Sequence, residues 1–184
     1  MKLTMKPTVF LLDVDGVFTD GKFVYTAEGK LSKTFGPDDN DALCLLKDQL
    51  HIHAVSGDKR GFKITQKRIQ EDMGLPLDLV STFERVDWIK SHFDPKKVIY
   101  MGDGIFDPLV FKHVAYSIAP ANAFYKTKEA ANFITQARGG EAPRGTARKS
   151  GSWALLRWRG DGGGDGERPR QGRICRATDL RPGE

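Results

Sequence analysis

Short apolar runs alternate with longer amphipathic segments along the first 131 residues. Short apolar runs predict buried strands; one such run is Val9–Leu12, which Asp13 follows. Segments in which apolar residues return every three or four positions predict helices. Because strands and helices alternate, we expect an α/β domain, a three-layer Rossmann-like parallel sheet. The expected strands are 9–12, 52–56, 79–81, 97–101 and 115–118, and the expected helices are 37–50, 59–73, 84–92, 106–113 and 123–131.

One segment breaks this alternation. Residues 22–35 place apolar side chains on either side of the turn-like sequence Ala27–Lys30. Two short alternating runs around such a turn predict a β-hairpin.

Charge and glycine divide the chain near residue 139. The 184 residues carry a formal net charge of +5, of which residues 1–138 hold +1 and residues 139–184 hold +4. The second segment also holds 11 of the 20 glycines. We therefore expect a folded domain over 1–141 and a disordered Arg/Gly-rich tail over 142–184. The tail could instead be an arm that binds nucleic acid, or an out-of-frame translation.

Composition also excludes several classes of protein. No run of 18 apolar residues predicts a transmembrane helix, and the stretch before the first strand is too short for a secretory signal. Cys44 and Cys175 are too few for a disulfide framework or a four-ligand zinc site. The body has no basic stripe, so nucleic acid is not an expected partner. We expect a cytoplasmic protein without a membrane partner.

Carboxylates and a hydroxyl follow three of the expected strands. Asp13 and Asp15 come after the first strand, Ser56 ends the second, and Asp103 follows the strand over 97–101. The carboxyl ends of parallel strands meet at one edge of a sheet, so these groups should converge there. Carboxylate oxygens suit Mg²⁺, and magnesium beside a hydroxyl favours phosphoryl chemistry. One aspartate can attack phosphorus while a second transfers protons.

The same residues carry a family resemblance. The run Asp13–Gly21 resembles the first motif of haloacid-dehalogenase (HAD) superfamily phosphatases, Ser56-Gly57 resembles the second, and Gly102–Asp107 resembles the fourth. The likeness covers residues 8–141 and is greatest to the capless branch that includes the 3-deoxy-manno-octulosonate 8-phosphate phosphatases. It implies a HAD-like fold in which the hairpin is a flap that replaces the cap domain.

The resemblance also implies roles for individual residues. Asp13 would be the nucleophile and Asp15 the general acid and base, while Ser56 would hold the phosphoryl group together with backbone near Gly16 and Gly57. Mg²⁺ would be held by Asp13, the backbone carbonyl of Asp15 and Asp103, with Asp107 orienting a metal-bound water or a cation. The family's motif-three cation matches Arg85, with Lys90 as the alternative; Arg85 could also be a solvated surface arginine.

Two departures from the family pattern affect these expectations. Where the branch commonly reads Thr-Gly-Arg, this chain has Ser56-Gly57-Asp58. Lys59 or Arg60 could therefore supply the partner of the substrate carboxylate, or both could be ordinary surface charges. Gly104 replaces an acid in motif four. The family's closing Gly-Gly-x-Gly begins at Gly139 and stops after Glu141.

The function implied by the resemblance is a Mg²⁺-dependent phosphomonoesterase. Its substrate would be a phosphorylated 2-keto-3-deoxy sugar acid of eight or nine carbons, cleaved through an aspartyl-phosphate, and the enzyme would be a homotetramer. Two alternatives stay open. One is a phosphatase of another small sugar phosphate, and the other is a non-catalytic domain that accompanies an acylneuraminate cytidylyltransferase.

Overall fold

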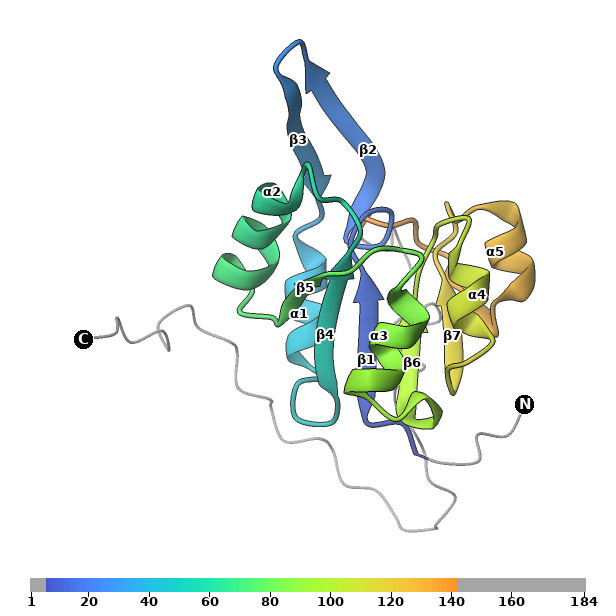
Figure 1. Cartoon of the computed structure of the whole chain (residues 1–184). Helices are drawn as coiled ribbons and strands as arrows, with labels where there is room; N and C mark the ends of the chain where they lie inside the picture. The colour runs from blue at the N-terminus through green and yellow to red at the C-terminus, as the bar shows by residue number, and fades with distance from the viewer. Residues whose placement is uncertain (1–5, 142–184) are drawn as a thin grey trace.

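A six-stranded parallel sheet forms the centre of the molecule, in the order β5-β4-β1-β6-β7-β8 (Figure 1). The structure, a computed structural model, describes residues 6–141. Its strands are β1 (Val9–Asp13), β2 (Thr19–Thr26), β3 (Gly29–Phe35), β4 (His51–Ser56), β5 (Leu77–Leu79), β6 (Val98–Met101), β7 (Tyr116–Ala119) and β8 (Phe133–Ile134). Its α-helices are α1 (Asp38–Cys44), α2 (Phe62–Gln66), α3 (Arg85–His92), α4 (Asp107–Phe111) and α5 (Tyr125–Ala130). The expected α/β class and parallel sheet are confirmed.

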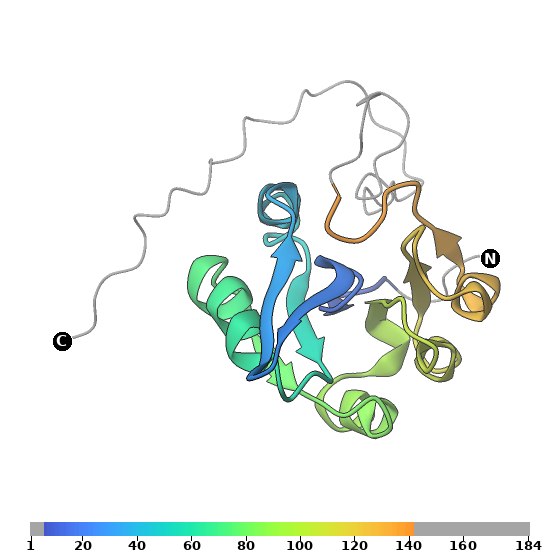
Figure 2. The ribbon, with the colours of Figure 1, turned by 90° about the horizontal axis from the view of Figure 1, so that it is seen from above.

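Strand β1 lies between β4 and β6, and all five of its residues are buried. Phe10 and Leu12 point to one face of the sheet, where they pack with Leu43 of α1 and with Ile69, which follows α2. The alternate residues point to the other face and pack with side chains of α3 and α4. Figure 2 shows helices on both sides of the sheet. Burial on both faces explains why β1 reads as a continuous apolar run.

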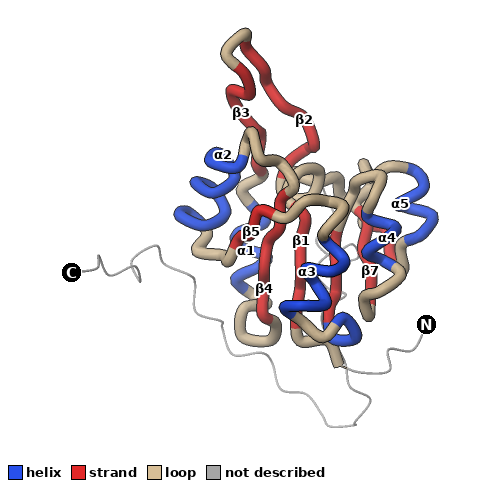
Figure 3. The backbone as a smooth tube through the Cα atoms, in the orientation of Figure 1, coloured by secondary structure: helices blue, strands red, loops and turns tan. Residues whose placement is uncertain are grey.

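The hairpin of β2 and β3 stands beyond the carboxyl end of β1, away from the main sheet (Figure 3). Its strands are antiparallel, and their register shifts between Thr19 and Phe23 and again between Val24 and Tyr25. The expected hairpin over 22–35 is confirmed, with β2 beginning earlier, at Thr19. We call this hairpin the flap.

Several element boundaries differ from those expected. Helix α1 ends at Cys44, and residues 45–50 form turns, because the chain must reverse there to enter β4. The helix expected over 59–73 begins at Phe62 and continues as a π-helical segment, Lys67–Asp72. A short 3₁₀ turn, Pro95–Lys97, precedes β6. Strand β5 lies two residues earlier than expected, and the two-residue β8 carried no recognisable run.

Two further expectations concern the C-terminal tail and membrane-spanning helices. The tail over 142–184 lies outside the described residues. Within residues 6–141, no helix has the length and apolar character needed to cross a bilayer.

Candidate active site

Side chains singled out as candidates from the sequence converge at the carboxyl edge of the sheet. Asp13 ends β1, Ser56 ends β4, and Asp103 follows β6 by two residues. Arg85 reaches the same edge from the first turn of α3, and Asp107 reaches it from the first turn of α4. Hydrogen bonds and short carboxylate distances join these groups, as the topology of a parallel sheet requires.

Three carboxylates form a compact group that we call the acid cluster: Asp13, Asp103 and Asp107. One oxygen from each lies within 4.8 Å of one oxygen from each of the others. Burial, followed by repulsion from the other two carboxylates, raises the pKa of Asp103 to about 8. Burial and Asp13 likewise raise the pKa of Asp107 to about 6. The acid cluster therefore has too little positive charge around it, and a divalent cation would supply what is missing.

Arg85 is the cation that faces the acid cluster. Its side chain is 1% exposed, and its Nη1 donates to Asp13 Oδ2 at 2.7 Å and to the Tyr100 hydroxyl at 2.8 Å. Burial opposes the charged form, but Asp13 and the other negative partners outweigh it and raise the pKa of Arg85. Lys90, the alternative motif-three cation, is exposed. The structure therefore places Arg85, and not Lys90, against Asp13.

Tyr100 connects this cation to the third acid. Its hydroxyl accepts from Arg85 and donates to Asp107 Oδ1 at 2.8 Å, while the Gly104 amide donates to Asp107 Oδ2 at 2.7 Å. Sequence reasoning missed Tyr100, since a tyrosine in the middle of a buried strand looks like core. Asp107 is consequently held at both oxygens.

Glycine is required at two positions beside the acids. Gly16 has φ +88°, and a Cβ there would lie 1.9 Å from Asp103 Oδ2. A Cβ at Gly102 would lie 2.4 Å from Asp107 Oδ2. Around Gly57 a Cβ would meet only ordinary van der Waals contacts. Glycines 16 and 102 therefore make room for the carboxylates themselves.

Asp15 lies on the flap side of Asp13. Lys33 Nζ is 2.8 Å from Asp15 Oδ1 and 3.0 Å from Oδ2. The Ser56 hydroxyl, which accepts from the Asp58 amide at 3.2 Å, donates to Asp15 Oδ2 at 3.4 Å. Burial raises the pKa of Asp15 by more than Lys33 lowers it. Asp15 is thus a carboxyl group whose proton affinity is increased, the property that an acid catalyst needs.

A second group of charges surrounds Lys33. We call it the flap cluster, and it comprises Asp15, Lys30, Lys33, Asp58 and Thr65. Lys33 Nζ also lies 2.8 Å from Asp58 Oδ2 and donates to Thr65 Oγ1 at 2.8 Å, and Lys30 pairs with the same Asp58 oxygen. Although burial opposes ionisation, both lysines hold the pKa of Asp58 at about 2. Two lysines and two carboxylates therefore balance each other.

Sequence reasoning missed both flap lysines. They are three residues apart, and in a regular strand such residues face opposite sides. The shift of register near Tyr25 falls opposite Lys30, and a shift of this kind can turn both lysines toward Asp58. No sequence signal marks such a shift.

Lys59 and Arg60, expected to meet the substrate, are exposed on the loop after β4. No ion pair joins either to another residue of the described segment 6–141. Lys33, from the flap, instead shares the Asp15 carboxylate with the Ser56 hydroxyl. A role for Lys59 or Arg60 in binding substrate stays a prediction.

The last described residues pack against the loop after β1. The Gly139 amide donates to Asn122 Oδ1 at 2.7 Å, and Asn122 Nδ2 donates to the Gly16 carbonyl at 3.2 Å. The Gly140 amide donates to the Val17 carbonyl at 3.1 Å. A Cβ at Gly139 would lie 1.9 Å from the Gly16 carbonyl oxygen. The Gly139-Gly140 pair thus supports the loop that carries Asp15.

Sequence comparison identifies relatives with one shared name. No family model matches the chain. A Haemophilus influenzae protein named 3-deoxy-D-manno-octulosonate 8-phosphate phosphatase KdsC is 30% identical over 137 residues, which cover 71% of this chain and 74% of the relative. A Yersinia pestis protein of the same name is 25% identical over 158 residues, covering 80% of this chain and 79% of the relative.

Solved structures agree with the sequence relatives. The cobalt-bound deoxy-D-mannose-octulosonate 8-phosphate phosphatase of Haemophilus influenzae has a TM-score of 0.65 at 27% identity, over 74% of this chain and 81% of that one. A YrbI family phosphatase from Pseudomonas syringae also scores 0.65, at 30% identity over 73% and 78%. A HAD family hydrolase from Streptomyces avermitilis shares the fold, with a TM-score of 0.62 at 22% identity over 76% of this chain and 84% of that one. The chain therefore belongs to the KdsC family of HAD-superfamily phosphatases and is a phosphoric monoester hydrolase.

Proposed function

We propose that this chain is a Mg²⁺-dependent phosphatase of 3-deoxy-D-manno-octulosonate 8-phosphate or a nine-carbon sugar-acid phosphate. The observation that carries the proposal is the acid cluster together with Arg85, which holds one oxygen of Asp13 at 2.7 Å. The relatives are named for the eight-carbon substrate, which supports that substrate here. Nothing in the residues distinguishes eight from nine carbons.

The acid cluster fits a hard divalent cation. Asp13 and Asp103, with the backbone carbonyl of Asp15, would hold it, and Asp107 would orient its water. Carboxylate and carbonyl oxygens are the ligands that Mg²⁺ prefers. When bound, the ion would neutralise charge that builds up on the phosphoryl oxygens. The pKa of about 8 at Asp103 supports this fit, because burial and the neighbouring carboxylates disfavour its charged form and a bound cation would favour that form.

The chain's own residues then perform two displacements. An Asp13 oxygen would attack phosphorus and form an aspartyl-phosphate, while the bond from phosphorus to the sugar oxygen breaks and Asp15 gives that oxygen its proton. Asp15 would next take a proton from water as the water attacks the phosphoryl group, which releases phosphate and regenerates Asp13. Arg85 and Ser56 would hold the phosphoryl oxygens through the transfer.

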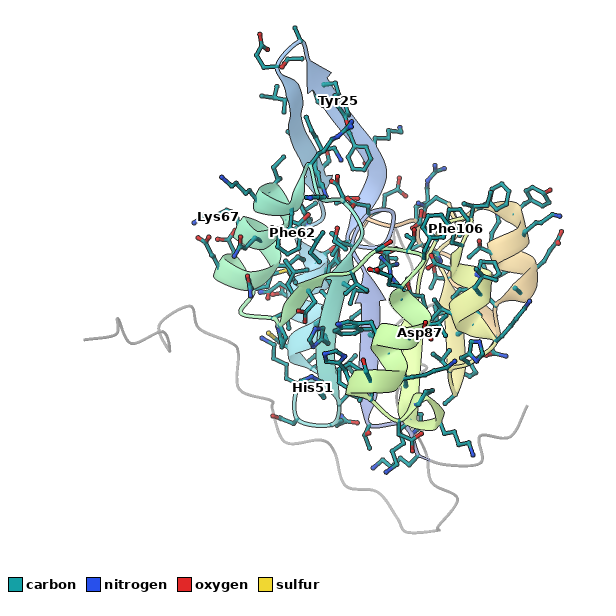
Figure 4. The ribbon with its side chains drawn as sticks, viewed as in Figure 1. Tyr25, His51, Phe62, Lys67, Asp87 and Phe106 are labelled. Carbon is teal, nitrogen blue, oxygen red and sulfur yellow. The ribbon has the colours of Figure 1, made fainter. Side chains whose placement is uncertain are left out.

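Assembly is a further part of the proposal. The flap exposes apolar side chains at its outer end, among them Tyr25 (Figure 4), with Val24 and Leu31 also exposed. Such a surface supports burial against a second copy of the chain and the homotetramer expected from the family resemblance. A non-catalytic domain is the weaker alternative, since the Asp13, Asp15 and Asp103 carboxylates all lie at the site.

The test measures phosphate release by the full-length protein from a panel of sugar phosphates that includes eight- and nine-carbon keto-acid phosphates. We expect release that needs Mg²⁺ and falls at least about 1,000-fold in Asp13→Asn. Asp87→Asn, an exposed carboxylate on α3, is the matched control and should retain wild-type rates. A folded wild-type protein that releases no phosphate from any of these substrates would contradict the proposal.

A further inference from the structure

Lys33 has an unusual position for a lysine. Its side chain is 0% exposed, although it comes from the flap and not from the core of the domain. A buried ammonium is costly unless its hydrogen atoms are all bonded to acceptors. Here three groups accept from it: Asp15, Asp58 and Thr65. The ammonium, carried by strand β3, is therefore held by acceptors from three segments: the loop after β1, the loop after β4 and helix α2.

The contacts on the two carboxylates are unequal. Asp58 also pairs with Lys30 and accepts from the Gly61 amide at 3.1 Å, so it keeps partners if Lys33 is removed. The other polar contact described for the Asp15 carboxylate is the Ser56 hydroxyl, at the long distance of 3.4 Å. The orientation of Asp15 therefore depends on Lys33 far more than the orientation of Asp58 does.

Gly61 and Phe23 lie beside the side chains of Lys33 and Lys30. A Cβ at Gly61 would lie 2.8 Å from Lys33 Cε and 2.7 Å from Lys30 Cδ. The glycine that precedes α2 thus allows both lysine chains to pass beside the helix. Phe23 closes the other side, with the Lys30 ammonium 3.4 Å from its ring centre and that of Lys33 at 5.5 Å.

We propose that Lys33 is a positioning residue, by which the flap holds the Asp15 carboxylate where it can exchange protons with the reacting oxygens. This inference rests on the role proposed above for Asp15. Proton transfer requires a heavy-atom separation of about 2.6–3.2 Å, so a carboxylate free to rotate loses most of its effect. Lys33 does not touch the substrate in this account; it acts through Asp15.

The decisive experiment compares two leaving groups. An alkyl sugar phosphate needs a proton on its leaving oxygen. The leaving group of p-nitrophenyl phosphate is p-nitrophenolate, an anion stable enough to depart without a proton. The ratio kcat/KM reports the steps up to loss of the leaving group. For Lys33→Met in the full chain we expect kcat/KM to fall about 30-fold on the sugar phosphate and less than about 3-fold on p-nitrophenyl phosphate, since general acid catalysis is worth about 10²–10⁴. Equal losses on both substrates would overturn the proposal.

Two controls keep the result interpretable. Lys22→Met removes an exposed lysine of the same hairpin and should leave both substrates unaffected. If Lys33→Met does not fold, Thr65→Val removes one acceptor of the ammonium, and a several-fold loss confined to the sugar phosphate is expected; equal effects on both substrates contradict the proposal.

A crystal structure of Lys33→Met tests the inference without activity. We expect the Asp15 carboxylate to leave its present position, and a carboxylate that keeps this position in the variant overturns the inference. Wild-type protein that hydrolyses neither substrate would contradict the proposed function, while the crystal structure still decides the role of Lys33.

Discussion

The acid cluster and the flap cluster meet at the loop after β1, which supplies Asp13 to the first and Asp15 to the second, and their charges are arranged differently. In the acid cluster three carboxylates face Arg85, and the pKa values of Asp103 and Asp107 rise to about 8 and about 6. In the flap cluster two lysines face two carboxylates, and the pKa of Asp58 falls to about 2.

The difference separates two functions of buried charge. A group with excess negative charge gains free energy when a cation binds, so the acid cluster is suited to hold a ligand. A balanced group gains nothing from another ion and instead fixes side-chain geometry. Substitutions in the two clusters, and changes of Mg²⁺ and pH, should therefore affect the free energy of unfolding in different ways.

Removal of the buried cation should be the most damaging change. Arg85→Met leaves Asp13 and Tyr100 without their shared hydrogen-bond donor and Asp107 without an ion-pair partner at 3.6 Å. Breaking a buried ion pair costs about 3–5 kcal/mol. Urea unfolding in EDTA measures the loss. The comparison predicts that saturating Mg²⁺ recovers part of it, and no recovery would argue against a cation site in the acid cluster.

Magnesium should stabilise the protein through the acid cluster. At 100 times its Kd the ion adds about 2.7 kcal/mol to the free energy of unfolding. We expect a Tm several degrees higher in Mg²⁺ than in EDTA, and a much smaller difference in Asp103→Asn. Asp58→Asn, in the balanced cluster, should keep the full magnesium effect. An unchanged Mg²⁺ response in Asp103→Asn would break the comparison.

A side chain at Gly16 should crowd Asp103 and so weaken magnesium binding to the acid cluster. Gly16→Ala adds a Cβ that would lie 1.9 Å from Asp103 Oδ2, at φ +88°, and we expect a loss of about 1–3 kcal/mol together with a smaller magnesium effect. Gly74→Ala is the control, because its φ is +63° with no atom within 4 Å of the added Cβ. If both variants respond alike to Mg²⁺, backbone strain alone explains Gly16.

Acidification should affect the flap cluster specifically. Because the folded pKa of Asp58 is about 2 and the unfolded value is near 3.8, its stabilisation is present above pH 4 and is lost as the pH falls toward 2. After allowance for solvent screening, the contribution is about 1 kcal/mol. Unfolding at pH 5 and pH 2.5 should show a smaller difference in Asp58→Asn than in wild type. An identical pH dependence would remove the contrast between the clusters.

Much of the site could be predicted because its parts follow buried strands. The run Val9–Leu12 predicts β1, and because the carboxyl ends of parallel strands share one edge of a sheet, the sequence also predicts that Asp13, Ser56 and Asp103 lie together. Tyr100 and Lys33 could not be predicted in the same way. Both lie within strands. In the sequence, Tyr100 looks like an ordinary core residue and Lys33 like an ordinary polar residue of a hairpin, and the partners of both come from distant segments.

The ends of short helices and strands could not be predicted from the sequence either. Helix α1 ends six residues before the apolar pattern does, since Leu46 and Leu50 pack against the core from turns and not from a helix. Apolar spacing reports which side chains face the core, and a turn can satisfy it as well as a helix. Strand β8 could not be predicted either, because its two residues are too few to show an alternation of apolar and polar positions.

The most direct test of the account is to trap the phosphorylated nucleophile. Full-length protein would be quenched during turnover of the eight-carbon sugar-acid phosphate in Mg²⁺ and treated with borohydride, which reduces an acyl phosphate to an alcohol. Mass spectrometry would then locate the modified residue. The account predicts homoserine at position 13, dependent on both substrate and Mg²⁺. Active protein with no modification at Asp13, or with the modification at another carboxylate, would contradict it.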